Sequence, residues 1–262
     1  MEQNFFIALI LTIFAGLSTG IGSLMGLFAK KTNFKFLSLA LGFSAGVMLF
    51  VSFVDIYPKA FDMIVSIYSD KTATFLTAIA FFTGIILIFL IDKFLTKKMD
   101  QIKINQEDNT KKKNNLLKMG IFTALAVGIH NFPEGLVTFI AALSDPSMGI
   151  SIAIAIAIHN IPEGLAVSIP IYYSTGSRLK AFKYSFFSGI AEPVGAVIGY
   201  LVLIRFLNNA FIGFVFAAVA GIMVYISINE LIPTAKAHHK SDISLYGLII
   251  GMFVMAISLV LL

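Results

Sequence analysis

The chain has 262 residues, of which 58% are hydrophobic and only 13% charged, whereas about a quarter of the residues of a soluble domain are charged. Cysteine is absent, which excludes a disulfide framework and a thiolate metal site. The formal charge of +5 does not indicate nucleic-acid binding, because no basic helix or aromatic stacking platform accompanies it. This composition predicts an integral membrane protein.

Eight long apolar stretches, separated by short polar breaks, succeed one another along the chain. A helix that spans a bilayer needs about 20 mostly apolar residues, and each stretch supplies them. A transmembrane barrel is disfavoured, because its strands alternate apolar and polar residues, whereas these stretches are apolar all round. We therefore predict an all-α membrane protein, a single helical bundle of eight transmembrane helices. The expected helices cover about residues 5–29, 35–57, 72–92, 118–143, 148–174, 182–204, 209–234 and 243–262.

The basic residues predict how the helices are oriented. Of the 19 Lys and Arg residues, 16 lie in the first, third, fifth and seventh gaps between helices. Because cytoplasmic loops carry an excess of Lys and Arg, these four gaps are expected on the cytoplasmic side, with both termini outside the cytoplasm. The polar segment 97–117 is expected to be a mobile cytoplasmic loop. The chain is expected to cross the membrane several times.

The fourth and fifth stretches carry an internal repeat. The segment HNFPEG at 130–135 recurs 29 residues later as HNIPEG at 159–164. In each copy His and Glu are four residues apart, about 40° around a helix, so an imidazole and a carboxylate share one face. The proline between them removes a helical hydrogen bond and loosens the turn beside both side chains. Each copy therefore predicts a kinked helix that carries half of a metal site.

Helix direction predicts which members of the repeat meet. Consecutive transmembrane helices run in opposite directions, so His130 is expected level with Glu163, and His159 level with Glu134. A rise of about 1.5 Å per residue places these four groups roughly 18 to 29 Å above the cytoplasmic edge, around the middle of the membrane. Glu192 in the sixth helix is expected about a turn below them, at about 14 Å.

Three carboxylates are thus expected deep in the membrane with no Lys or Arg among them, although each such charge costs about 2.5–3.5 kcal/mol at the bilayer centre. Protons could neutralise them. The two histidines and two asparagines beside them favour a divalent cation instead, or two cations that share one bridging carboxylate.

At these residues the chain resembles the ZIP family of divalent-metal transporters, and within it the bacterial ZupT-like branch. The likeness extends over essentially the whole chain and includes both HN-x-PEG motifs, the Glu192-Pro193 pair and the segment NELIP at 229–233. It implies a binuclear metal site in which Glu163 is the shared ligand. The resemblance implies that one metal is held by His130, Glu134, His159 and Glu163, and the second by Asn131, Asn160, Glu163 and Glu192.

The same resemblance implies roles outside the repeat. Met48 and Asp55 would line the route toward the site, and Glu230 would lie on the inner exit path. His238 and His239 could accept metal on release. Packing of Met48, interfacial solvation of Asp55 and solvation of the histidine pair are the alternative interpretations.

The predicted function is transport of a divalent transition metal into the cytoplasm, with no enzymatic activity and no cofactor. Zinc comes first, then iron, manganese and cobalt, because imidazole with carboxylate suits all of them. One alternative is a proton-coupled carrier of an organic solute. The other is a membrane metalloenzyme, which is disfavoured because the chain lacks an HExxH motif. The expected partners are the metal ion and the lipid bilayer, and the sequence leaves open whether the protein forms a homodimer.

Overall fold

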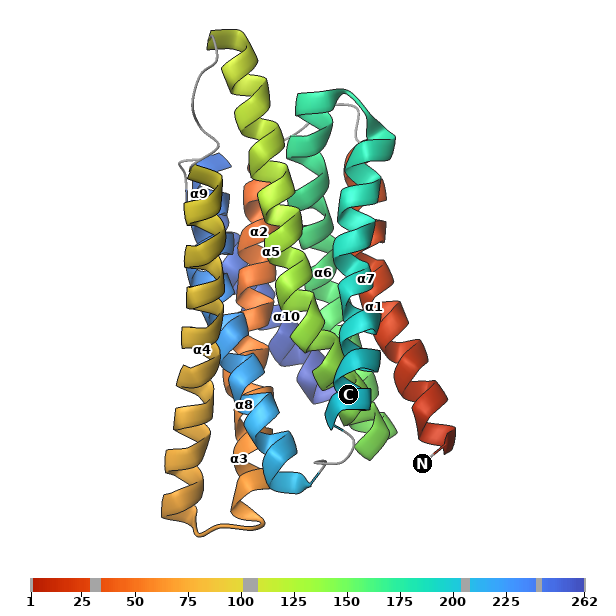
Figure 1. The fold of residues 1–262 in the computed structure, drawn as a ribbon, viewed down its shortest axis with the longest axis vertical. Helices are drawn as coiled ribbons and strands as arrows, with labels where there is room; N and C mark the ends of the chain where they lie inside the picture. Colours follow the sequence, from red (N-terminus) through yellow and green to blue (C-terminus); the bar gives the residue numbers. More distant parts are fainter. Residues whose placement is uncertain (1, 29–33, 101–107, 204–207, 239–241, 262) are drawn as a thin grey trace.

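The fold was obtained as a computed structural model that describes residues 2–28, 34–100, 108–203, 208–238 and 242–261 (Figure 1). Every regular element in these ranges is a helix, and eight helical spans are long and apolar enough to cross a membrane. Helices suit a bilayer because they satisfy all their backbone hydrogen bonds internally. The predicted all-α fold class is confirmed. The elements are α1 (Glu2–Phe28), α2 (Phe34–Val51), η1 (Ser52–Ile56), α3 (Tyr57–Val65), α4 (Asp70–Asp100), α5 (Asp108–Ser144), α6 (Pro146–Thr175), α7 (Arg178–Leu203), α8 (Asn209–Ile226), η3 (Ser227–Leu231), α9 (Ile232–His238) and α10 (Ile243–Leu261).

Two of the spans contain a π-helical turn that the sequence patterns did not predict. The α2 span continues through η1 and α3 as far as Val65, beyond its expected end at residue 57, and α8 continues through η3 into α9. In each turn a backbone N–H bonds the carbonyl five residues earlier, from Tyr57 to Ser52 and from Ile232 to Ser227. A proline, which has no N–H to donate, comes two residues after each turn, and the wider turn lets the helix continue past it.

The segment expected as a loop at 97–117 is helical wherever it is described. Helix α4 runs to Asp100 and α5 begins at Asp108, while residues 101–107 lie outside the described ranges. The prediction of a loop is therefore wrong for 97–100 and 108–117. Lys, Leu and Met are good helix formers, and extending an existing helix costs much less than starting one.

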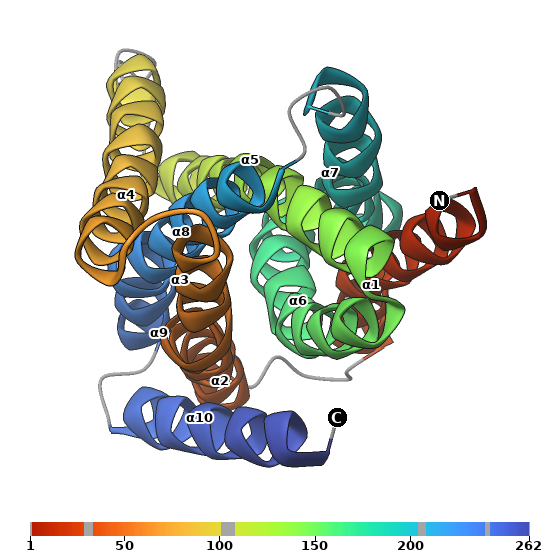
Figure 2. The same ribbon diagram turned by 90° about the horizontal axis from the view of Figure 1, so that it is seen from below.

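The helices form two groups that lie side by side in the view along the bundle (Figure 2). We name them the α5–α6 group, which contains α1, α5, α6 and α7, and the α2–α8 group, which contains α2, η1, α3, α4, α8, η3, α9 and α10. Glycines let the backbones inside each group approach closely: a Cβ on Gly22 of α1 would lie under 3.0 Å from the Ile161 carbonyl of α6, and one on Gly46 of α2 would do the same at Leu248 of α10. All the close glycine approaches of this kind among the described residues join helices of the same group.

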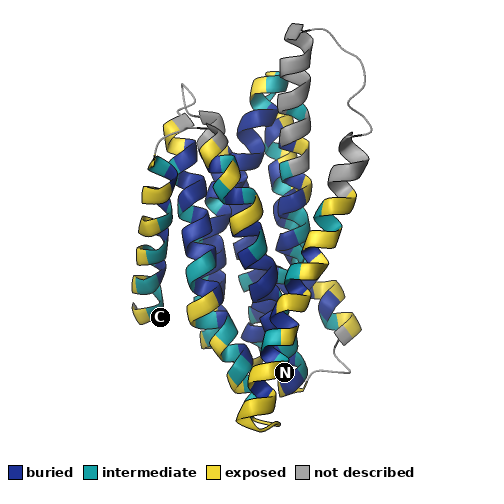
Figure 3. Ribbon diagram, turned by 90° about the vertical axis from the view of Figure 1, so that its left-hand side faces the viewer, coloured by how far each residue is buried: buried dark blue, intermediate teal, exposed yellow. Residues whose placement is uncertain are grey.

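A cluster of buried apolar side chains connects the two groups and includes Leu41, Met48, Ile156 and Met223. The outward faces carry large exposed apolar side chains, most evidently along α4 and α10 (Figure 3). Such faces would be unfavourable in water and suit contact with lipid. The buried polar side chains gather inside the α5–α6 group, which is where the two copies of the sequence repeat lie.

Candidate metal centre

The short junction between α5 and α6 places the two copies of the repeat against each other. Asp145 is the N-cap of α6, and its carboxylate accepts hydrogen bonds from the Ser147 amide at 2.9 Å and from the Ser147 hydroxyl at 2.8 Å. Both helices remain helical through Pro133 and Pro162. Proline cannot donate to the carbonyl four residues earlier, so each repeat has a weakened turn beside its histidine. The tight junction therefore aligns two similar but oppositely directed segments.

The four ionisable members of the repeat pair crosswise, as predicted from helix direction. His130 Nε2 lies 3.0 Å from Glu163 Oε2, and His159 Nε2 lies 3.4 Å from Glu134 Oε2. All four side chains are at most 1% exposed. Each pair joins α5 to α6, so both helices contribute an imidazole and a carboxylate to one buried layer.

The asparagines connect this layer to α7 and α1. The Asn160 amide donates to Glu192 Oε1 and also to the Ala15 carbonyl at 3.0 Å, while the Asn131 amide donates to the Ser188 carbonyl at 3.2 Å. Asn131, Asn160 and Glu192 are all completely buried. The structure thus brings the seven predicted ligands into one region of the α5–α6 group, including Glu192 from outside the repeat.

Each of the seven side chains has one buried polar atom without a hydrogen-bond partner among the described residues. The atoms are His130 Nδ1, Asn131 Oδ1, Glu134 Oε1, His159 Nδ1, Asn160 Oδ1, Glu163 Oε1 and Glu192 Oε2. Such atoms are rare, because an unsatisfied buried polar group costs about 1–3 kcal/mol. Their concentration at one place makes this region the candidate binding site.

The donor atoms have the chemistry of a divalent transition-metal site. Imidazole nitrogen, amide oxygen and carboxylate oxygen are all ligands that Zn²⁺ and similar ions accept. In the described ranges no Lys or Arg forms an ion pair with Glu134, Glu163 or Glu192. No three His, Asp or Glu side chains of the described chain are arranged as a ready metal site, because the histidines and glutamates are engaged with each other. A metal would have to replace these His–Glu contacts.

The residues implied outside the repeat lie away from these contacts. Met48 is completely buried in α2, Asp55 on η1 pairs with Lys59, and Glu230 on η3 is half-buried. His238 ends α9 but its side chain is not described, and His239 lies outside the described residues.

A second internal repeat was not recognised from the sequence, although its signal is present there. MLFVSFVDIYP at 48–58 matches MVYISINELIP at 223–233 in the Met, Ser, acidic and Pro positions. The two copies contain the two π-helical turns, and in each the serine hydroxyl bonds the methionine carbonyl. The acidic residues of the two copies, Asp55 and Glu230, therefore occupy equivalent positions.

Ser44 was also missed. Its hydroxyl donates to the His159 carbonyl at 3.2 Å and so connects α2 of one group to the repeat in the other. No sequence pattern could have revealed this contact, since the partner is a backbone atom 115 residues away.

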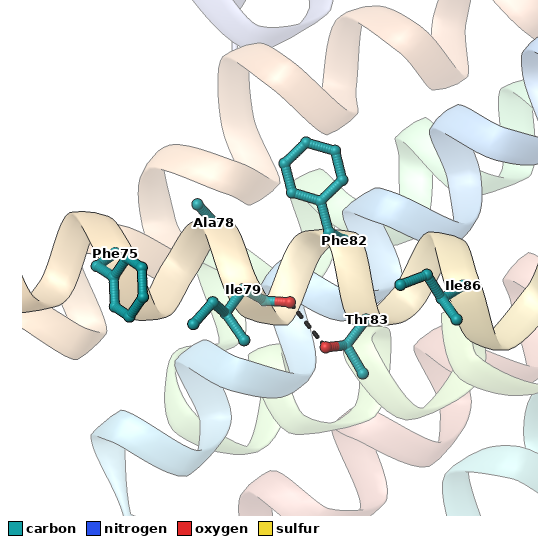
Figure 4. Close-up of a pocket in the computed structure, with 6 residues that line it drawn as sticks. All are labelled: Phe75, Ala78, Ile79, Phe82, Thr83 and Ile86. Carbon is teal, nitrogen blue, oxygen red and sulfur yellow. Dashed lines mark hydrogen bonds between the residues drawn. The ribbon is translucent and has the colours of Figure 1, made fainter.

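A hollow on the surface of α4 contributes nothing to the site (Figure 4). It is lined by residues of α4 alone, almost all of them apolar, and its one hydroxyl, on Thr83, already donates to the Ile79 carbonyl at 2.8 Å. It offers no ligand for a cation.

Comparisons with known proteins agree with this arrangement. A family model described as ZIP Zinc transporter matches residues 5–120 and 98–259. The chain is 55% identical over 266 residues to a zinc transporter ZupT of Oceanobacillus iheyensis, with 99% of each chain covered. It is 53% identical over 262 residues to the zinc transporter ZupT of Streptococcus mutans, covering 100% of this chain and 99% of that relative. For that of Clostridium perfringens the identity is 48% over 276 residues, with 99% and 97% covered.

The family model and these relatives match nearly the whole chain, and the matches also cover nearly the whole length of each relative. The segments that carry the buried His, Asn and Glu side chains lie inside the region that the family model matches. The chain therefore belongs to the ZIP family of zinc transporters.

Proposed function

We propose that this protein carries Zn²⁺ across the membrane into the cytoplasm through a binuclear site formed by the seven buried side chains. The observation that carries the proposal is the set of seven unpartnered donor atoms, one on each of these residues. Membership of the ZIP family makes the protein a transporter of divalent metal and not an enzyme.

We assign one metal to the histidines and their partner carboxylates, and the second to the asparagines and Glu192. The crosswise His–Glu contacts support the first set, and the contact of Asn160 with Glu192 supports the second. Glu163 bridges the two metals in this assignment, because one of its oxygens faces His130 and the other has no partner among the described residues. Binding requires neutral imidazoles, so the metal assigned to the histidines enters as the His–Glu contacts open.

Zinc is the first substrate, since the relatives are named zinc transporters. Iron, manganese and cobalt are further substrates, because affinity for mixed imidazole and carboxylate sites differs among these ions by degree. We place the protein in a bacterial inner membrane with both termini outside the cytoplasm, on the distribution of 16 of the 19 Lys and Arg residues. The end of the bundle that holds Asp145 is then the outer end.

Reconstitution in liposomes tests the proposal. Wild-type protein is expected to let Zn²⁺, Fe²⁺ and Mn²⁺ enter vesicles that contain a metal-sensitive dye, and His130→Ala is expected to slow zinc uptake at least tenfold, because it removes a ligand. Asp70→Asn, an exposed carboxylate at the start of α4, serves as the matched control and should retain the wild-type rate. Wild-type vesicles that take up no metal would overturn the proposal and favour a proton-coupled carrier of an organic solute.

Zinc is also expected to stabilise the purified protein. A ligand that binds only the folded state at 100 times its Kd adds about 2.7 kcal/mol, which corresponds to a rise in Tm of roughly 5–10 °C for a chain of this size. Thermal unfolding in detergent, with and without Zn²⁺, measures this rise. Mg²⁺ at the same concentration should produce a smaller one, because it prefers oxygen ligands and dehydrates reluctantly. A rise of equal size in His159→Ala would show that zinc acts elsewhere.

A further inference from the structure

The two copies of the second repeat face each other from the two sides of a shared contact. Helix α2 packs against η3, and α8 packs against η1. Helix α3 follows η1 and helix α9 follows η3, and these two helices lie at opposite ends of the bundle (Figure 1). Because the two spans run in opposite directions, Asp55 on η1 and Glu230 on η3 lie toward opposite ends. Under the orientation proposed above, Asp55 lies toward the outer end and Glu230 toward the cytoplasm.

The copies differ on the helical turn after the acidic residue. Four residues after Asp55 stands Lys59, whereas four residues after Glu230 stands Thr234. On a helix this spacing brings the two side chains together. The outer carboxylate therefore has a built-in cation on the next turn, and the inner carboxylate has none at the equivalent position.

Lys59 and Asp55 form a close ion pair. The Lys59 ammonium lies 2.8 Å from Oδ1 and 3.0 Å from Oδ2 of Asp55, so it contacts both carboxylate oxygens. The Asp55 side chain is 13% exposed and that of Lys59 is 30% exposed, so the lysine covers the more buried carboxylate. Both oxygens of the Asp55 carboxylate therefore already have a cation from the same helix beside them.

This pair lies near the outer ends of the helices that carry the metal centre. Hydrogen bonds from Ser147, with a smaller contribution from the charge of Lys59, hold the pKa of the Asp145 carboxyl below its usual value. Asp145 is the residue between α5 and α6. Helix α3, which carries Lys59, and this junction both lie at the end of the bundle seen in Figure 2.

We propose that Lys59 is a specificity-determining residue: a tethered cation that occupies the Asp55 carboxylate toward the outer end of the bundle and that an incoming divalent metal must displace. The inference rests on the proposed function, because it concerns access to the same site. A monovalent ion offers Asp55 no more charge than the ammonium already does, whereas a divalent ion is attracted about twice as strongly at the same distance. The pair thereby favours divalent over monovalent cations, at the cost of a higher KM for zinc.

This assignment is tested by measuring the rate of zinc uptake by proteoliposomes at different concentrations of zinc and of NaCl. Lys59→Gln is expected to lower the KM for zinc about two- to fivefold, because the free energy of a partly exposed ion pair corresponds to about this factor in affinity. The kcat should change little. The KM of this variant should also rise more steeply with NaCl than that of wild type, since its unpaired carboxylate attracts Na⁺ and is screened by it. Lys59→Arg should behave as wild type because it keeps the ion pair.

Asp55→Asn supplies the matched background. It should raise the KM for zinc, and Lys59→Gln added to it should have no further effect, because the carboxylate for which the lysine competes is gone. A KM for Lys59→Gln equal to or above that of wild type would overturn the inference. An effect of Lys59→Gln on KM that is the same in wild type and in Asp55→Asn would also overturn it. Wild-type protein without zinc flux would overturn the proposed function as well, whereas normal flux with an unchanged KM in Lys59→Gln overturns this inference alone.

Discussion

Glu163→Gln is expected to abolish zinc uptake and to weaken zinc binding by at least about 100-fold, since even the partners of metal ligands contribute 10- to 100-fold. Glutamine keeps the volume of the completely buried side chain but removes its charge. One Glu163 oxygen lies 3.0 Å from His130 and the other has no partner among the described residues, so the carboxylate can serve two metals at once. Its loss should therefore affect both metal positions.

Metal content of the purified variants checks this expectation. In the proposed assignment wild type binds two zinc ions, Glu163→Gln binds fewer than one, and Glu192→Gln keeps the one that the histidines hold. Glu192→Gln is the matched comparison, because it makes the same chemical change at another completely buried glutamate. Equal losses of zinc in the two variants would contradict a shared ligand, and two ions retained by Glu163→Gln would remove it from the site.

Gly135→Ala is expected to destabilise the protein and to abolish transport, although Gly135 binds no metal. A Cβ at this position would lie under 3.0 Å from the Glu192 carbonyl oxygen, which is backbone and cannot move without moving α7. Overpacking of a rigid contact costs about 3 kcal/mol or more, which corresponds to a fall in Tm of roughly 10 °C. Since Glu192 would move with its backbone, the contact with Asn160 would also be lost.

Gly128→Ala is the control for this variant, because Gly128 lies on α5 as Gly135 does and also faces α7. A Cβ there would lie 3.7 Å from the Ser188 Cα, which is ordinary van der Waals contact. Alanine favours a helix by up to about 1 kcal/mol over glycine, so Gly128→Ala should leave Tm unchanged or raise it. Thermal unfolding and zinc uptake measured on both variants make the comparison, and equal behaviour would refute a special role for the close approach at Gly135.

The residues proposed as metal ligands could be recognised from local pattern because their chemistry is unusual for a membrane interior. Charged and imidazole side chains are costly there, so each one stands out from an apolar background. The crosswise contacts of His130 with Glu163 and of His159 with Glu134 could be predicted from helix periodicity and opposite helix direction alone. The depth of Glu192 placed it only about a turn below them, and the family resemblance implied that it is a ligand.

Other features could not be read from the sequence, for distinct physical reasons. The π-helical turns depend on how α2 and α8 pack, since a proline more often ends a helix than widens it. The helical continuation into 97–117 reflects propagation from a helix already formed, which composition does not reveal.

By itself, the sequence determined the membrane setting, the eight spans and the paired HN-x-PEG segments, because hydrophobic length and helix periodicity are local properties of the chain. The set of seven candidate ligands came from the resemblance of these segments to the ZIP family. The tertiary structure decided how the helices divide into two groups and where the backbone partners lie. Ser44 reaches the His159 carbonyl across 115 residues, and the approach of Gly135 to Glu192 joins α5 to α7. Such contacts depend on which backbones come together in space, and no local pattern encodes that.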